Sequence, residues 1–175
     1  MYIGLTSLSV LFVASLIAYF VTRAQSTVWR DQAAPDLPAG LWASSLVLVL
    51  LSLSLHYGER GIRRNLPDRL ITGLGLATVL AFTFLLLQLR NWGEVAASRL
   101  SGPPKSLYEF TFYMLTGLHA LHVLAGIVPL LVILRRAQAR EFSSSHHEGV
   151  RLVRQYWDFL LGVWFVLYLS ISIGS

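Results

Sequence analysis

Five long apolar runs, separated by short polar segments, make up most of the chain. They extend over Met1–Thr22, Leu37–Gly58, Leu70–Leu89, Phe110–Leu134 and Gln155–Ser175, and the only charged residue within them is Asp158. A helix needs about 20 residues to cross a hydrocarbon core of ~30 Å. A segment in lipid must also satisfy its own backbone hydrogen bonds, which favours helices.

The pattern therefore predicts an all-α integral membrane bundle, built as one transmembrane domain over residues 1–175. Its five transmembrane helices are expected at roughly 3–22, 39–57, 70–89, 107–134 and 154–173.

Composition agrees with lipid as the solvent. Of the 175 residues, 55% are hydrophobic and only 13% are charged, and the mean hydropathy is +0.61. A soluble domain carries about 25% charged residues. The chain has no cysteine, which excludes disulfides and thiolate metal sites. The net charge of +5 does not indicate nucleic acid, because the basic residues lie in short loops between apolar runs.

The distribution of lysine and arginine predicts the orientation. Nine of the 14 basic residues fall in the second and fourth loops, so these loops are expected to be cytoplasmic. The N-terminus is then cytoplasmic and the C-terminus lies outside. The nine are Arg60, Arg63, Arg64, Arg69, Arg135, Arg136, Arg140, Arg151 and Arg154, and the other five are Arg23, Arg30, Arg90, Arg99 and Lys105.

Polar residues in or beside the apolar runs are the first places to look for chemistry, because burying them is costly unless they are paired or functional. They are His56, Gln88, Glu109, His119, His122 and Asp158.

His119 and His122 are three residues apart and project from one helix face, so they could share a metal if a third ligand were present. The sequence offers none. His56 is near the inner end of its run whereas His119 is near mid-depth, which does not suit a haem held by two histidines. We favour imidazoles that hydrogen-bond to neighbouring helices or lipid head groups over a metal or haem site. We thus expect no metal or cofactor in this chain.

Asp158 lies near the cytoplasmic start of the fifth run, where it could reach interfacial water or pair with Arg154, four residues earlier. We interpret it as an interfacial acid. The alternative is a proton relay, which generally needs several partners across the membrane. That run contains no other acid.

Small and aromatic residues add packing predictions. Close helix approach is expected at Gly117 and Gly126, helped by Ala120 and Ala125, and interfacial aromatic belts are expected at Trp29, Trp92 and Trp157. No nucleophile–base pair, phosphate-binding glycine loop or nucleotide fingerprint appears in the sequence. This argues against an autonomous enzyme.

The segment Phe112–Gly126, FYMLTGLHALHVLAG, resembles the signature of the haem-copper oxidase subunit III family, which reads Thr-Gly-Phe-His-Gly-Leu-His-Val followed by glycine. The resemblance covers all five runs in order and is to the short form of the family. Further matches are Ala18-Tyr19-Phe20 with Arg23, Leu37-Pro38 with Trp42, Ser44 and Ser45, and Tyr156-Trp157 with Phe159, Val163, Trp164 and Tyr168.

Several acidic positions depart from the family. Leu8 replaces a glutamate after Ser7, Arg151 replaces another, and Asp158 and Leu161 stand where the family has histidine and aspartate. Gln88 is followed by Asn91 and Trp92 instead of a glutamate and an aromatic residue. Proton or lipid contacts that depend on those acids are not carried over to this chain.

The resemblance implies a non-catalytic subunit of a respiratory terminal oxidase that packs on subunit I and holds phospholipid. Haem and copper would lie in subunits I and II, and the complex could join a larger respiratory supercomplex. The short form implies a bacterial inner membrane, and cytochrome c is the expected electron donor. The residues carried over as packing or lipid-facing positions are Trp42, Ser45, Gln88, His119, His122, Trp157 and Trp164.

Three alternatives stay open at this point. The chain could be subunit III of a quinol oxidase, or an accessory subunit of a nitric oxide reductase. It could also be a small proton-coupled transporter that uses His119, His122 and Asp158.

Overall fold

Five helices account for nearly all of the computed structural model, which describes residues 2–26, 40–97 and 107–174, with side chains from residue 6 to residue 172. In chain order the helices are α1 (Tyr2–Gln25), α2 (Gly40–Arg63), α3 (Pro67–Ala97), α4 (Leu107–Gln138) and α5 (Glu148–Gly174). The predicted positions Trp29, Arg30, Leu37, Pro38, Arg99 and Lys105 lie outside the described residues.

Two of the connections are built by helix-capping geometry. At the end of α2, Asn65 takes a positive φ of 55°, and the amides of Asn65 and Leu66 donate to the carbonyls of Ile62 and Gly61. This is the Schellman pattern that satisfies the last carbonyls of a helix. Pro67 then opens α3 at the first helical position, where a missing N–H costs nothing. Arg140, with φ 57°, ends α4 in the same way.

These two connections meet at one end of the bundle. The guanidinium of Arg140 pairs with the carboxylate of Asp68 at 3.0 Å, and the amide of Ser144 donates to the Asn65 side chain at 3.2 Å. The α2–α3 and α4–α5 turns therefore lie on the same side, as expected for the second and fourth loops.

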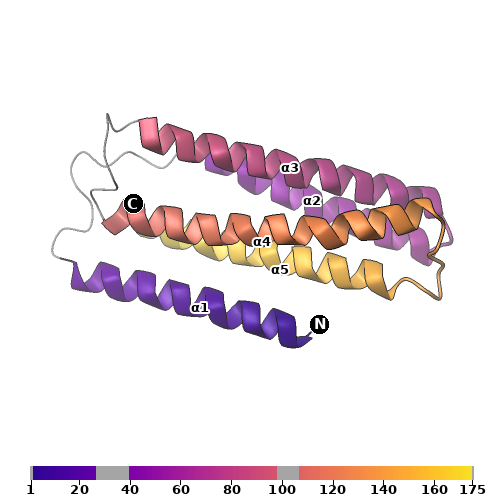
Figure 1. Ribbon diagram of the computed structural model, residues 1–175, viewed down its shortest axis with the longest axis horizontal. Helices are drawn as coiled ribbons and strands as arrows, with labels where there is room; N and C mark the ends of the chain where they lie inside the picture. The colour runs from indigo at the N-terminus through magenta and orange to yellow at the C-terminus, as the bar shows by residue number, and fades with distance from the viewer. Residues whose placement is uncertain (1, 27–39, 98–106, 175) are drawn as a thin grey trace.

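Helices α2 to α5 form a closed ring in which each helix contacts two neighbours, and α1 packs outside against α4 and α5 (Figure 1). The buried apolar positions of α5 follow alternating steps of three and four residues. In α5 they are Val150, Val153, Trp157, Leu160, Trp164, Leu167 and Ile171. This is the heptad spacing of helices that cross at about 20°.

The α2–α3 pair is held together most tightly, because two glycines face each other. A Cβ added to Gly73 would lie 2.6 Å from the carbonyl oxygen of Ser54 and 2.8 Å from the Cα of Gly58. Only glycine at position 73 allows the two backbones to come this close.

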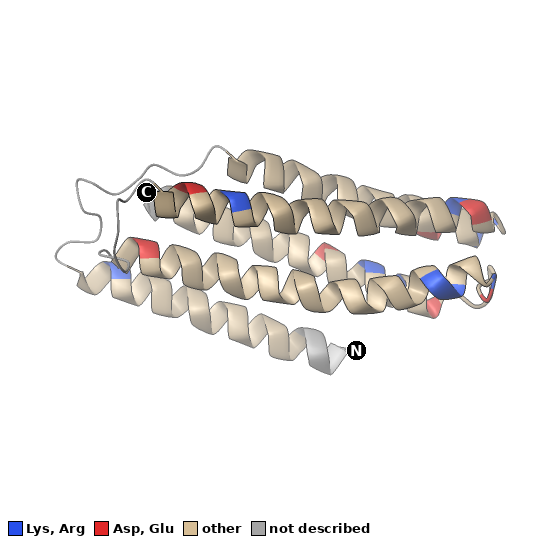
Figure 2. Cartoon of the chain, turned by 45° about the horizontal axis from the view of Figure 1, so that its top comes forward, with Lys and Arg blue, Asp and Glu red and all other residues tan. Residues whose placement is uncertain are grey.

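The helices are longer than the predicted apolar runs, and α5 begins six residues earlier, at Glu148 instead of 154. The reason is that polar turns continue the helices beyond the apolar region. Hydropathy alone therefore predicts helices that are too short. Most charged turns lie towards the two ends of the bundle, and one acidic and one basic turn lie nearer its middle (Figure 2).

Four of the five helices, α1 to α4, are long and apolar enough to cross a membrane by length and composition. Helix α5 is 27 residues long but is not among the four. Its first half carries Glu148, Arg151, Arg154 and Asp158, which lower its hydropathy. The all-helical fold is confirmed, with spanning character assigned to four helices.

Candidate functional site

Helices α2 and α5 share an ionic cluster that is centred on Glu59. This side chain is only 6% exposed, and its carboxylate is shared between two arginines. Arg63, on the next turn of α2, donates to Oε1 at 2.5 Å, and Arg154 of α5 donates to Oε2. A buried charge is tolerated when it is paired in this way.

Asp158 belongs to the same cluster. Its Oδ2 accepts from Arg154 at 2.5 Å and its Oδ1 accepts from the hydroxyl of Ser52 at 2.6 Å. The predicted pairing of Asp158 with Arg154 is therefore confirmed. The Ser52 contact also ties Asp158 to α2.

His56 completes the cluster in a tautomer that its neighbours determine. The carbonyl of Ser52 can only accept, so Nδ1, at 2.9 Å, must carry the hydrogen. Arg154 can only donate, so Nε2, at 3.1 Å, must present its lone pair. Nε2 of His56 also lies 3.7 Å from Oδ2 of Asp158, and the two carboxylates of the cluster pair with Arg63 and Arg154.

The sequence analysis did not predict that Glu59 and Ser52 belong to this cluster, although their spacing indicates a common helix face. Positions 52, 56, 59 and 63 recur at helical spacing on one face of α2, and 154 and 158 do so on α5. Reading Glu59 as the first loop residue after an apolar run hid this spacing.

His119 lies at the centre of the bundle and is fully buried. Its ring contacts Phe84 of α3, with centroids 5.7 Å apart, and Trp164 of α5 at 5.0 Å. Phe12 of α1 lies at 6.4 Å. Among the described residues neither ring nitrogen has a hydrogen-bond partner. The predicted hydrogen bond to a neighbouring helix is therefore wrong for His119, because aromatic rings occupy its surroundings.

His122 also lies beside Phe12, but its ring has a hydrogen-bond partner. Its ring is 5.0 Å from that of Phe12, and its Nδ1 is 2.7 Å from the carbonyl oxygen of Leu118, on its own helix. The hydroxyl of Tyr156 donates to the backbone carbonyl of His122 at 2.8 Å, which ties α5 to α4.

Gly126 makes that tie possible. A Cβ added there would lie 2.5 Å from the Tyr156 ring and 3.3 Å from the Trp157 ring, so the predicted close approach is confirmed at this glycine. Trp157 is buried between helices, with 1% exposed. Ala120 is also buried, whereas Ala125 is exposed.

The two other predicted tryptophans, Trp42 and Trp164, differ in burial. The indole N–H of Trp164 donates to Ser45 at 2.9 Å inside the bundle, and Ser45 donates to the carbonyl of Leu41. Trp42 is 72% exposed and touches only the edge of Tyr168 among the ring contacts described. The structure thus brings Ser45 and Trp164 together and leaves Trp42 facing outward.

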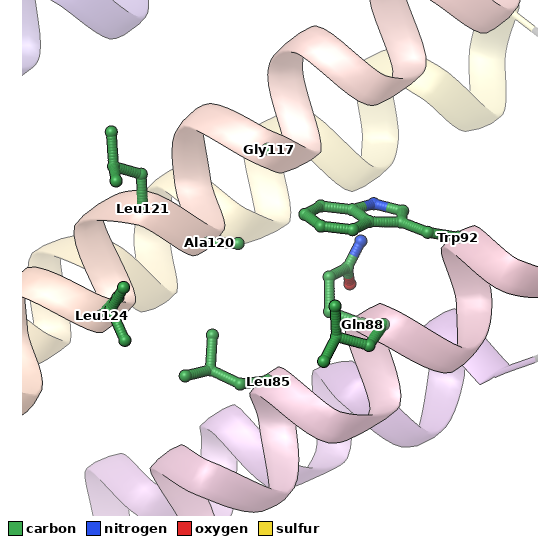
Figure 3. A pocket seen from close by; sticks show the side chains of 8 residues that line it. Leu85, Gln88, Trp92, Gly117, Ala120, Leu121 and Leu124 are labelled. Atoms are coloured by element: carbon green, nitrogen blue, oxygen red, sulfur yellow. The ribbon is translucent and has the colours of Figure 1, made fainter.

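Gln88 and Asn91 occupy successive turns of α3 and differ in their partners. Asn91 donates to Ser44 of α2 at 3.2 Å. Gln88 is 1% exposed, and neither atom of its amide has a partner among the described residues. It lines a groove of about 340 Å³ between α3 and α4, together with Trp92 and Gly117 (Figure 3).

Close approach was also predicted at Gly117, and there the structure differs. An added Cβ would meet only the Trp92 ring, at 4.0 Å. Gly117 instead lines the groove between α3 and α4.

Glu109 is buried in the first turn of α4, far along the helix from His119. Within residues 6–26, 40–97 and 107–172, no group of three or more potential ligand side chains comes close enough to hold a metal ion. The four helices that are long and apolar enough to cross a membrane define the class: a multi-pass helical membrane protein.

The model of the cytochrome c oxidase subunit III family matches residues 3–175. The chain belongs to this family and is therefore a subunit III of a haem-copper oxidase, which functions in a complex with other oxidase subunits. The matches do not favour a nitric oxide reductase subunit or a transporter.

Similar proteins come from distant organisms. The cytochrome c oxidase subunit 3 of Synechocystis is 30% identical over 165 residues, which cover 93% of this chain and 69% of the cyanobacterial protein. That of Spodoptera frugiperda is 33% identical over 73% of this chain and 84% of its own length. That of Mus musculus is 32% identical over 71% of this chain but only 46% of its own length. The chain is thus shorter than several of its relatives.

Proposed function

We propose that this subunit III is a structural component that packs against subunit I, holds phospholipid and contains no redox centre of its own. Haem and copper would reside in subunits I and II, and electrons would come from cytochrome c, as the name of the relatives says of them. The complex could also form part of a larger respiratory supercomplex.

The observation that carries this proposal is that side chains of this chain already surround Glu59, Asp158 and His119. Glu59 and Asp158 pair with Arg154, and the ring of His119 is enclosed by aromatic residues. A cofactor would have to displace these contacts. The large exposed apolar side chains on every helix suit lipid and a neighbouring membrane subunit.

We further propose that all five helices cross a bacterial inner membrane, with a cytoplasmic N-terminus and a periplasmic C-terminus. The start of α1 and the end of α5 lie towards opposite ends of the bundle, which fits an odd number of crossings (Figure 1). Helix α5 lies alongside α2 and α4 in the ring, and the α2–α3 and α4–α5 turns share one end (Figure 1). The basic residues at that end support its cytoplasmic placement.

The test is to purify the chain gently from its native membrane and identify the subunits that accompany it. We expect subunits I and II, a haem signal in the reduced-minus-oxidised spectrum, and oxygen consumption with reduced cytochrome c. A chain that is stable alone and colourless would contradict the proposal. Reduction of nitric oxide without oxygen consumption would assign the complex to the reductases.

Metal analysis tests the absence of a redox centre in this chain. In the assembled complex, the double variant His119→Ala with His122→Ala is expected to keep the haem and copper content of the unmodified complex. Loss of one equivalent of either would show that the histidine pair holds a cofactor.

A further inference from the structure

The groove between α3 and α4 has the size and lining of a small-molecule site. Its volume of about 340 Å³ lies within the range of roughly 300–1,000 Å³ that is usual for ligand pockets. Leucines of both helices form its walls, and three of them, Leu89, Leu121 and Leu124, are more than half exposed. The groove therefore opens on the outside of the bundle, towards lipid in the proposed membrane placement.

One polar side chain lies at the inner wall of this apolar groove. Gln88 has both an unpartnered donor, Nε2, and an unpartnered acceptor, Oε1, among the described residues. Its amide lies next to the Trp92 ring (Figure 3). The indole of Trp92 is held in place by a hydrogen bond to Thr116 at 3.0 Å, and its carbonyl accepts from Tyr113 at 3.1 Å.

We propose that this groove binds an uncharged, lipid-soluble alcohol whose hydroxyl group hydrogen-bonds to the Gln88 amide. A hydroxyl group both donates and accepts, so it satisfies Oε1 and Nε2 together. An ester carbonyl only accepts and leaves Oε1 unpaired. A charged head group is disfavoured, because none of the residues that line the groove is charged. The site is additional to the structural role proposed above and rests only on its membrane placement.

Gly117 makes it possible to close the groove without disturbing the core. An added Cβ at position 117 meets only the Trp92 ring, at 4.0 Å, so a larger side chain extends into the groove. Gly162 of α5 is the matched control, because a Cβ added there meets nothing within 4 Å. Gln88→Leu removes the hydrogen-bonding group while keeping a side chain of similar size.

The experiment uses the purified oxidase complex in detergent and a long-chain alcohol with a photoreactive diazirine on its alkyl chain. After illumination, mass spectrometry locates the label. We expect labelling within residues 85–92 and 117–124, and competition by the unlabelled alcohol. Its methyl ether, which cannot donate, should compete about tenfold less well.

The variants separate binding from folding. Gln88→Leu should weaken labelling about tenfold without lowering the thermal stability of the complex, since it removes a buried unpaired amide. Gly117→Leu should abolish labelling and Gly162→Leu should leave it unchanged.

Labelling spread over exposed leucines of all helices, equal labelling in the Gln88 and Gly117 variants, or equal competition by phosphatidylcholine would each overturn the proposal. A complex that keeps its subunits but shows no label in the groove refutes this site alone and leaves the structural role intact.

Discussion

The inner α2–α5 interface and the middle of α4 both bury titratable side chains, but they stabilise them in opposite ways. Glu59 is buried and Asp158 is half-buried, and each carboxylate is within hydrogen-bonding distance of Arg154. His119 is buried without a polar partner in the described structure, and aromatic rings surround it. An imidazole can remain neutral by losing a proton at ordinary pH, whereas an arginine cannot.

The difference shows that a match to the family motif does not predict how strongly a substitution in either region will destabilise the protein. The histidine pair belongs to the family motif, yet the structure uses His119 as an aromatic filler. The ionic cluster is made partly by residues that do not match the family pattern, including Asp158. Removing one member of a charged cluster leaves a buried charge unpaired, which is the more damaging change.

The largest expected effect is therefore at Glu59. Replacing Glu59 by glutamine leaves Arg154 and Arg63 without their shared carboxylate, and we expect a destabilisation of about 3–5 kcal/mol. It is measured as a lower temperature for loss of this subunit from the purified complex. Glu94→Gln is the control, because Glu94 forms an exposed pair with Arg90 and should cost about 0.5 kcal/mol or less. Equal effects of the two changes would show that the Glu59 cluster is not buried in the complex.

The next largest effect is expected at Gly126, where α4 packs closely against α5. Gly126→Ala places a methyl group 2.5 Å from the Tyr156 ring, so we expect a loss of about 1–3 kcal/mol from overpacking. The same thermal measurement should show no loss for Gly162→Ala, whose added methyl group meets nothing. If both variants behave alike, α4 and α5 pack less closely than described.

A smaller effect is expected for a neutral hydrogen bond between α2 and α5, the two helices that also hold the ionic cluster. Ser45→Ala removes the acceptor for the Trp164 indole and should cost about 0.5–1.5 kcal/mol. The near-ultraviolet circular dichroism of the purified complex should change in the tryptophan region. Ser15→Ala, on the exposed side of α1, bonds only to its own helix among the contacts described and should leave the spectrum unchanged.

The smallest effect is expected at the residue that first seemed most functional. His119→Phe replaces a buried ring without a polar partner by an apolar ring of similar shape, so the stability should change by less than about 1 kcal/mol in either direction. Oxygen consumption should be preserved. A loss comparable to that of the Glu59 variant would mean that His119 has a polar partner in the complex, and the comparison between the two regions would fail.

Much of the fold could be predicted because lipid imposes a simple rule on sequence. The uncharged stretches 37–58, 70–89 and 110–134 each lie largely within one helix, and the Phe112–Gly126 motif indicated the family that the comparisons confirm. The ends were less accurate. Helix α5 begins at Glu148, well before the predicted start, and Trp157 and Asp158 lie in helix–helix contacts.

The sequence by itself determined the helical class, the approximate segments and the pairing of Asp158 with Arg154, because these depend on hydropathy and on spacing within one helix. The tertiary structure decided which face of each helix lies inside. In a membrane helix the outward face is as apolar as the inward one, so periodicity in the sequence is weak. Only packing could bring Glu59 to Arg154, enclose His119 in aromatic rings and leave the amide of Gln88 at the wall of an open groove.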